Sequence, residues 1–439
     1  MARVYPFRAW RYNPSAVRLD DVLTQPSDKI TPAMQQAYYQ RSPFNVIRMV
    51  LGLPELFDAE RGGNVYTRAA ENFHAWRQQG VLIREKEPCI YAYAQRFRLP
   101  NRQPGTEIGV ERRGFLALGH LYSDAEGVVF RHEETLHELK SDRLSLLRAT
   151  RAHFEPILML YSDPAGSVEH ILYDGGGPAD AEVADEFGVL HRLWRISDPA
   201  TLRLLTTAMA DKKLIIADGQ DGYQTALEYA DEHGHTEPAP AEHSAMQLGR
   251  PPYPEAAAPM VFVNMDSANL VILPTYRVIH GVAGFDPAAF ARAAEKFFTM
   301  EPLPPADAGV YLEALRNEPD AALVAVTAAG AVLLRPRLTE TALADPPPRL
   351  CAIGLVQLHS MVLRRLLGLD ASDARLGYPS DAAEAVSQVR RGEAQAAFLI
   401  NPVTVEQIRE VAFAGDLLPP MSTDFFPKLL SGLAIYALE

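Results

Sequence analysis

Cysteine is nearly absent from this sequence, which has only Cys89 and Cys351 in 439 residues. The two lie far apart and neither belongs to a CxxC pair, which argues against a disulfide framework and a zinc ribbon. Long apolar runs are also missing, since the longest, residues 321–334, is too short to span a bilayer. No apolar signal segment is visible near the start, so we predict a cytoplasmic protein without a membrane partner.

An excess of positive charge is missing as well. Lys and Arg number 42 against 55 Asp and Glu, which gives a net charge of −13. Proteins that bind duplex nucleic acid normally carry a basic stripe that neutralises phosphates. We therefore predict that nucleic acid is not a partner. The sequence gives no indication of the oligomeric state.

The chain has enough apolar residues, 48% over its length, to build more than one core. Residues 236–259 are rich in Pro, Ala and Glu and lack periodicity, as is typical of a linker or mobile loop. We predict an N-terminal α/β domain (1–235), this linker (236–259) and a C-terminal α/β domain (260–439) that packs back on the first.

Three histidines lie in or beside this linker. His233, His235 and His243 match no standard set of metal ligands, so solvated histidines are expected.

One stretch has the pattern of a strand that turns into a helix. Residues 214–217 form a short apolar run, Asp218-Gly219 follows, and Tyr223, Ala226, Leu227 and Ala230 then recur with helical spacing. Such a turn places free backbone N–H groups beside a carboxylate, which suits a bound anion or a substrate hydroxyl. The alternative is an ordinary turn in which Asp218 or Asp221 caps the helix.

A second stretch, residues 131–143, gathers a base, a hydroxyl and several cations. Phosphoryl transfer needs these types, because cations offset the developing charge while an imidazole or carboxylate accepts the hydroxyl proton. The alternative is a solvated helix start with Thr135 and Glu138 as a capping box. The candidate residues of this stretch are Arg131, His132, Glu133, Lys140 and Arg143.

Further candidates lie at predicted strand ends and near the C-terminus. Arg277 could clamp a phosphate or carboxylate through two N–H groups, although a surface ion pair is equally consistent with its position. Ser422, Thr423 and Lys428 combine hydroxyls with a cation. Two other short segments, residues 44–52 and 169–173, are predicted as strands.

Several segments together resemble one family. They read PFRAWRY near the start, SPFNVIR (42–48), RHEETLHELKSDR (131–143), IADGQDGYQTALEY (216–229), LVILPTYRV (270–278) and STDFFPKLLSGL (422–433). Their order and content are similar to domain-of-unknown-function family 1015. This chain departs from the family where the two His and the Arg of the central motif DGHHR are replaced by Gln220, Asp221 and Gly222, and where the His of PTHR is Tyr276. The retained frame comprises Asp28, Asn45, Arg48, Asp218, Gly219, Tyr223, Thr225, Ala226 and Lys428.

The family's DGHHR motif also resembles that of free-serine kinases in the ParB/sulfiredoxin-like group. The resemblance implies an α/β (α+β) fold, with a ParB/sulfiredoxin-like core elaborated by additional mixed-sheet and helical layers. It further implies a divergent kinase or phosphotransferase that acts on a small hydroxy or amino-acid substrate. Mg²⁺ with a nucleotide or pyrophosphate is the implied cofactor, with a bridge between Asp218 and Asp221 as one arrangement, and no dedicated metal ligands are assigned. The alternative is a ligand-binding or regulatory protein that has lost turnover.

These expectations sort the candidate residues by role. The predicted catalytic residues are His132, Glu133 and Asp218. The predicted ligand-binding residues are Asn45, Arg48, Arg131, Lys140, Arg143, Gly219, Tyr223, Thr225, Arg277, Ser422, Thr423 and Lys428.

Overall fold

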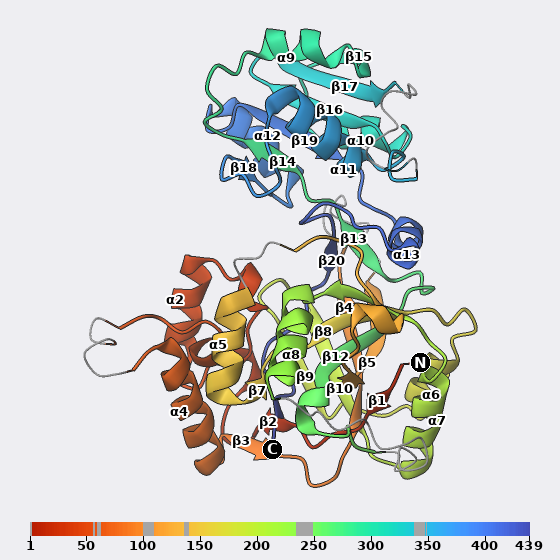
Figure 1. The fold of residues 1–439 in the computed structure, drawn as a ribbon. Coiled ribbons are helices and arrows are strands. Elements are labelled where there is room, and N and C mark those ends of the chain that lie inside the picture. Colours follow the sequence, from red (N-terminus) through yellow and green to blue (C-terminus); the bar gives the residue numbers. More distant parts are fainter. Residues whose placement is uncertain are drawn as a thin grey trace. The chain divides into compact units, whose positions relative to one another are not determined.

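The structure is a computed structural model that describes residues 2–55, 58, 63–99, 109–135, 140–233, 249–337, 347 and 349–439 (Figure 1). The chain forms two compact units. The first comprises Met1–Phe130, His137–Leu270 and Pro427–Glu439, and the second comprises Arg131–Leu136 and Val271–Phe426. The predicted α/β class is confirmed, since each unit combines helices with a sheet.

The division of the chain differs from the predicted one. The two units separate after Leu270 rather than within residues 236–259. Part of that segment, residues 236–248, lies outside the described residues, whereas β12 (Ala257–Asn264) is a fully buried strand inside the first unit's sheet. The last thirteen residues, 427–439, also return to the first unit. Pro and Ala content therefore did not mark the boundary, because strand pairing with distant segments decides where β12 belongs.

A nine-stranded mixed sheet organises the first unit. Its order is β6-β11-β8-β12-β5-β4-β10-β9, and β1 pairs with β5. Parallel pairs join β6 to β11 and β8 to β12, and the remaining pairs are antiparallel. The strands are β1 (Val4–Tyr5), β4 (Ile90–Phe97), β5 (Val110–His120), β6 (Val129–Phe130), β8 (Ile157–Tyr161), β9 (Ala181–Ala184), β10 (Leu190–Ile196), β11 (Leu214–Asp218) and β12.

Helices and short strands surround this sheet. The helices α4, α5 and α8 lie side by side (Figure 1). The helical elements are α1 (Leu19–Val22), η1 (Ser27–Lys29), α2 (Pro32–Arg41), α3 (Ile47–Val50), α4 (Val65–Gln78), η2 (Asp124–Glu126), α5 (Lys140–Thr150), α6 (Ser167–Tyr173), α7 (Pro199–Met209), α8 (Gln220–Glu232) and η3 (Pro254–Ala256). Two small sheets pair β2 (Trp10–Tyr12) with β3 (Leu82–Arg84), and β7 (Ala152–His153) with β21 (Tyr436–Ala437).

The two faces of the large sheet differ in character. On one face, alternate residues of the central strands such as Phe115, Met159 and Phe262 join an apolar core with side chains from α6, α7 and α8. Because successive side chains of a strand point to opposite faces, the intervening residues face the other way. Among those are Gln95 and Arg112, which hydrogen-bond to the C-terminal segment 427–439. The polar face is therefore the one on which this segment lies.

The second unit is built on a six-stranded antiparallel sheet, in the order β15-β17-β16-β19-β14-β18, and a separate pair, β13 with β20. Its helix α11 continues directly into the π-helix η5. The elements are β13 (Val271–Leu273), β14 (Arg277–Ile279), α9 (Pro287–Ala294), β15 (Phe298–Leu303), α10 (Ala308–Arg316), β16 (Leu323–Thr327), β17 (Gly330–Pro336), α11 (Gly354–Gln357), η5 (Leu358–Leu367), β18 (Leu376–Gly377), α12 (Ala382–Arg390), β19 (Ala396–Ile400), α13 (Val405–Ala414) and β20 (Asp424–Phe426).

Two segments predicted as strands are helical. Residues 47–50 form α3 and residues 167–173 form α6. A short apolar run fits a buried strand or a buried helical turn equally well, and periodicity cannot separate them. Within the described residues, no helix is both long and apolar enough to cross a membrane.

Candidate functional site

The predicted strand–turn–helix is confirmed and ends in an accessible carboxylate. Strand β11 ends at Asp218, and Gly219 adopts a left-handed conformation (φ 84°) as the N-cap of α8. Its backbone approaches Ile157 closely, because a Cβ atom at Gly219 would lie 3.4 Å from the Ile157 Cα atom. No side chain caps α8, and the Asp218 side chain is 36% exposed. Asp218 is therefore neither the cap of its own helix nor sealed from solvent.

Lys428 reaches Asp218 from the C-terminal segment. Its Nζ atom donates to Asp218 Oδ2 at 2.7 Å, although the two residues are 210 positions apart. Asp218 Oδ1 also accepts the Gly219 N–H at 3.0 Å. Partial burial raises the pKa of the Asp218 carboxyl, but Lys428, Lys29 and this N–H outweigh burial and lower it. Asp218 is consequently ionised at neutral pH.

A second carboxylate shares this environment. Asp28 lies in the short helix η1, next to Lys29. The Asp28 residue is exposed at the surface, but partial desolvation by the surrounding protein and the negative charge of Asp218 raise its pKa, against the opposing effect of Lys29 and Lys428. We call these four residues, Asp28, Lys29, Asp218 and Lys428, the Asp218 cluster. Two neighbouring carboxylates in it thus have pKa values that move in opposite directions.

The neighbouring turn is held by a half-buried ion pair. Glu155 accepts from the Ser27 N–H at 2.8 Å and from the Ser431 hydroxyl at 2.9 Å, and it pairs with Arg143 of α5. Burial raises the pKa of Glu155, but Arg143 and these hydrogen bonds lower it overall. Arg143 also donates to the Ser27 hydroxyl. The predicted ligand-binding residue Arg143 therefore anchors the turn that carries Asp28.

The sequence offered a weak signal for Asp28. Asp28 was named only among the residues that this chain shares with the family, and nothing local indicates a charged site. Lys29 had no signal at all. Only the fold brings η1 close to the end of β11, so these two residues were missed as site residues.

A separate polar group lies in the second unit. The His132 Nε2 atom is 2.8 Å from the Thr423 hydroxyl, which is 3.3 Å from Glu133 Oε2. The same Glu133 oxygen accepts the Ser422 N–H at 3.0 Å. His132 is only 1% exposed and packs edge-on against Phe425. These four residues, His132, Glu133, Ser422 and Thr423, form the Glu133 cluster. They join residues 131–135 to residues 418–423, and they belong to a different unit from Asp218.

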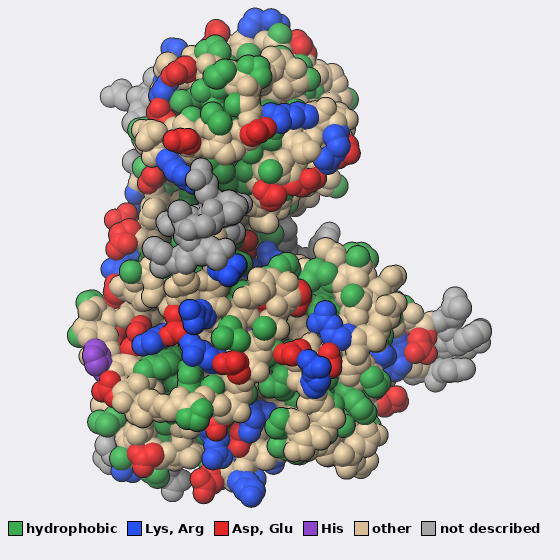
Figure 2. All heavy atoms as spheres, turned by 180° about the vertical axis from the view of Figure 1, so that it is seen from behind, with side chains coloured by type: hydrophobic (Ala, Val, Ile, Leu, Met, Phe, Trp, Pro, Cys, Tyr) green, Lys and Arg blue, Asp and Glu red, His purple; other side chains and the backbone are tan. Residues whose placement is uncertain are grey.

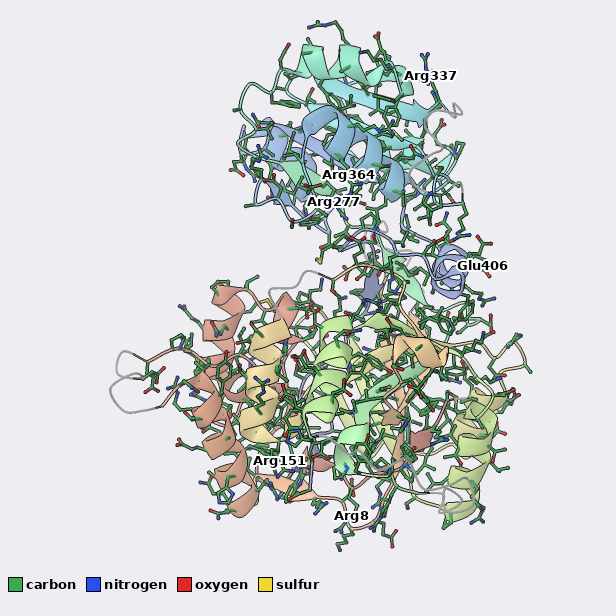
Figure 3. The ribbon with its side chains drawn as sticks, viewed as in Figure 1. Arg8, Arg151, Arg277, Arg337, Arg364 and Glu406 are labelled. Carbon is green, nitrogen blue, oxygen red and sulfur yellow. The ribbon has the colours of Figure 1, made fainter. Side chains whose placement is uncertain are left out.

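Arg277 is closed to ligands by its own contacts. It is fully buried within the second unit (Figure 3). Its Nε donates to His359 Nε2 at 3.1 Å, and its Nη atoms donate to the backbone carbonyls of Thr275, Tyr276, Pro420 and Met421. Five donors thus meet five acceptors. Burial lowers the pKa of Arg277 to about 10 and that of His359 to about 2, so Arg277 is charged and His359 neutral at pH 7. Arg277 holds its own unit together.

Three further predicted ligand-binding residues also make internal contacts. Asn45 donates to the Asp21 carbonyl and accepts the Ile47 N–H, and Arg48 donates to the Tyr39 carbonyl. The Tyr223 hydroxyl bonds to both the N–H and the carbonyl of Tyr122. The functional prediction for these three residues has no support in their geometry.

Other predicted residues have less definite settings. The Thr225 side chain is buried in α8, and no partner of its hydroxyl is found within the described residues. Arg131 is half-buried at the start of the second unit's first segment. Lys140 begins α5, but its side chain and Glu138 lie outside the described part of the structure.

The described residues do not form a dedicated metal site. Among them, no group of three His, Cys, Asp or Glu side chains is arranged to hold a metal ion. His233 bonds to the Tyr229 carbonyl, while His235 and His243 lie outside the described residues. Mg²⁺ is usually held by one or two carboxylates together with substrate phosphates rather than by a protein cage. A magnesium requirement, including the Asp218–Asp221 bridge, therefore stays a prediction.

Positive and negative side chains are mixed on the face of the molecule seen in Figure 2. There, Lys and Arg side chains are interspersed with Asp and Glu over the first unit. The absence of a nucleic-acid partner stays a prediction.

Comparison with protein families identifies the family of this chain. The model of a protein family of unknown function, DUF1015, matches residues 4–340, which is most of the chain. The resemblance in the sequence is thereby confirmed. No curated protein matches the chain.

Comparison with solved structures gives distant similarities. A free serine kinase in complex with AMP is 13% identical, with a TM-score of 0.35, and the match covers 70% of this chain and 89% of that one. A conserved hypothetical protein from Pyrococcus furiosus is 12% identical, with a TM-score of 0.35 and coverages of 70% and 91%. SbnI from Staphylococcus aureus, truncated at its C-terminus, is 11% identical, with a TM-score of 0.33 and coverages of 72% and 85%. Similarity at this level supports no assignment of residues or substrate.

Proposed function

Because the chain belongs to the DUF1015 family, whose description assigns no activity, we propose a function from the Asp218 cluster itself: phosphoryl transfer to a small hydroxyl-bearing molecule. The observation that carries the proposal is the 2.7 Å contact of Lys428 with the accessible Asp218 carboxylate at the end of β11. Burial and neighbouring charges there move the pKa values of Asp28 and Asp218 in opposite directions. Neighbouring titratable groups whose pKa values are driven apart are typical of acid–base sites. The accessible Asp218 carboxylate and two lysines complete the set.

Each residue then has a distinct role. Asp28, whose raised pKa makes it the better base, accepts the proton of the substrate hydroxyl. The freed oxygen bonds to the terminal phosphorus of a nucleotide or pyrophosphate. The bond from that phosphorus to the bridging oxygen breaks, its electron pair stays on that oxygen, and the shortened nucleotide or a phosphate leaves. Lys29 and Lys428 offset negative charge on the transferring group. Asp218 remains ionised and holds Lys428 in place.

The base in this mechanism, Asp28, differs from the base predicted from the sequence. His132 and Glu133 were predicted to supply it, but their hydrogen bonds lie within the Glu133 cluster of the second unit. Asp28 shares its electrostatic environment with Asp218 and Lys428. Lys428 keeps its predicted place among the ligand-binding residues, whereas Asp218, which was predicted as catalytic, holds Lys428 in this proposal.

The alternative is ligand binding without turnover. It is favoured by the first turn of α8, where Gln220, Asp221 and Gly222 replace the family's two His and one Arg. A carboxylate in that turn opposes a phosphate at the helix N-terminus. Binding of a small molecule by the same cluster is common to both functions.

The test begins with thermal shifts of the full chain against nucleoside mono-, di- and triphosphates and pyrophosphate. Phosphorus NMR with small hydroxy-amino acids and other small alcohols then measures transfer. The variants are Asp28→Asn and Asp218→Asn, with Asp211→Asn as the matched control because Asp211 is 78% exposed. Transfer that both site variants strongly reduce, and the control variant does not, supports the enzyme. A shift without transfer supports the alternative, and no shift with any phosphate compound overturns both.

A further inference from the structure

A buried pair on the polar face of the sheet holds the backbone at Lys428. Gln95 of β4 and Arg112 of β5 are direct cross-strand partners, and they are 1% and 2% exposed. Arg112 Nη2 donates to the Pro427 carbonyl at 2.6 Å, and Gln95 Nε2 donates to the Lys428 carbonyl at 2.7 Å. Two successive carbonyls are thus fixed by two neighbouring side chains.

The pair is also locked internally. Arg112 Nε donates to Gln95 Oε1 at 3.0 Å, which fixes the orientation of the amide and points its NH₂ group at Lys428. Gln95 Nε2 also lies 3.4 Å from His191 Nδ1, and His191 Nε2 lies 3.3 Å from Asp185 Oδ2. A hydrogen-bonded chain of four buried residues therefore stands behind the Lys428 carbonyl.

Arg112 carries its positive charge in a buried position. Burial lowers the pKa of Arg112 to about 10, so it stays charged at neutral pH, and the Asp218 carboxylate favours that charge. A buried cation is costly, and neutral side chains suffice to satisfy a pair of carbonyls. A planar guanidinium, however, can donate hydrogen bonds to the Gln95 amide oxygen and to the Pro427 carbonyl at the same time and in a fixed geometry.

We infer that Arg112 and Gln95 are positioning residues that set the backbone of residues 427–428 and thereby direct the Lys428 ammonium at Asp218. The role rests on the proposed function only where it concerns catalysis. Residues 427–429 lie outside any helix or strand, so no regular backbone ladder fixes Lys428 in their place. Support for a reacting side chain by a rigid buried shell is what precise placement requires.

The first test needs no activity. In the wild-type protein the Lys428 side chain is 12% exposed, so an amine-reactive reagent detected by mass spectrometry should label it slowly. Two variants should remove this protection. Arg112→Lys keeps a positive charge but loses the planar set of N–H donors that a guanidinium offers. Gln95→Glu keeps the oxygen that accepts from Arg112 but loses the N–H group that donates to the Lys428 carbonyl. Unchanged labelling of Lys428 in both variants, with an unchanged circular dichroism spectrum, would overturn the inference.

Arg113→Lys is the matched control. Arg113 is the next residue of β5, points to the opposite face, is 47% exposed and pairs with Glu111. Its substitution should leave Lys428 protected. If Arg113→Lys exposes Lys428 as much as Arg112→Lys does, the effect comes from general loosening of β5 and the inference is wrong.

The second test is a double-mutant cycle on phosphate transfer. Arg112→Lys alone should lower kcat by about 100-fold, the scale of a catalytic group misplaced by an ångström, with a smaller change in KM. In a Lys428→Met background the same substitution should have no further effect, because its target is gone. Additive losses would show a structural role and overturn the inference. If the wild type transfers no phosphate, the proposed function fails, whereas the labelling result still decides on positioning.

Discussion

The Asp218 cluster and the Arg277 site use similar side chains in opposite ways. In the first, a lysine and a carboxylate pair at 2.7 Å, and the carboxylate is 36% exposed. In the second, a fully buried arginine gives each of its five N–H donors to its own unit. The first retains access for a ligand and the second does not. Residue type therefore suggests chemistry, but accessibility decides whether it can occur.

The largest expected effect concerns the closed site. Arg277→Met should lower the free energy of unfolding by about 3–5 kcal/mol, because it strands His359 and the carbonyls that Arg277 now satisfies. Chemical denaturation measures this loss. Arg364→Met is the control, since Arg364 is 67% exposed and its loss should cost less than about 0.5 kcal/mol. A normally stable Arg277→Met protein that loses nucleotide binding would reverse the comparison.

In the Asp218 cluster, we expect a substitution to lower activity strongly and stability only slightly. Lys428→Met should reduce phosphate transfer by about 100–1,000-fold, as expected for loss of one charge-stabilising group, with a minor effect on stability. Steady-state kinetics and thermal melting measure the two quantities. Lys213→Met offers an exposed lysine as control. Equal transfer by both variants would remove Lys428 from the mechanism.

The acid limb of the pH–rate profile should sharpen the role of Asp28. A base works only when deprotonated, so transfer should rise about tenfold per pH unit until the raised pKa of Asp28 is passed and then level off. Asp218 has a lowered pKa and stays ionised in this window, so the limb reports Asp28. The residual activity of Asp28→Asn should lack the limb, while Asp211→Asn should keep it. An identical limb in Asp28→Asn would assign the proton to another group.

The smallest effect concerns the Glu133 cluster. Thr423→Val should cost about 1–3 kcal/mol of stability, because it leaves buried His132 without its 2.8 Å partner. Transfer should be unchanged in a protein that remains folded. Thr327→Val, in a hairpin with an exposed hydroxyl, is the control. A large loss of transfer in stable Thr423→Val would restore the catalytic role that the sequence suggested for His132.

Local structure was predictable where a periodic signal was strong. An apolar run, the Asp-Gly turn and the recurrence of Tyr223, Ala226 and Ala230 gave β11 and α8 correctly. The strand predicted at residues 44–52 was wrong. Ile47, Met49 and Val50 are buried in a short helix, and its apolar residues follow one another as they would in a buried strand. The domain boundary failed for a related reason, since β12 is defined by its pairing with β5 and β8.

The candidate site was predictable only in part. Asp218, Gly219 and Lys428 were named from motifs, and the structure brings them together. Arg277, Asn45 and Tyr223 were named on the same grounds and serve the interior instead. A motif records which residues a family keeps, whether they bind ligands or hold the fold.

The sequence by itself determined family membership, the α/β class and the strand–turn–helix that presents Asp218. Only the tertiary structure decided which charged groups meet there. Asp28, Asp218 and Lys428 come from three segments spread over 400 positions of the chain, and their pKa shifts arise from mutual distance and burial. Such interactions fall off with separation in space and not along the chain, so no local pattern encodes them.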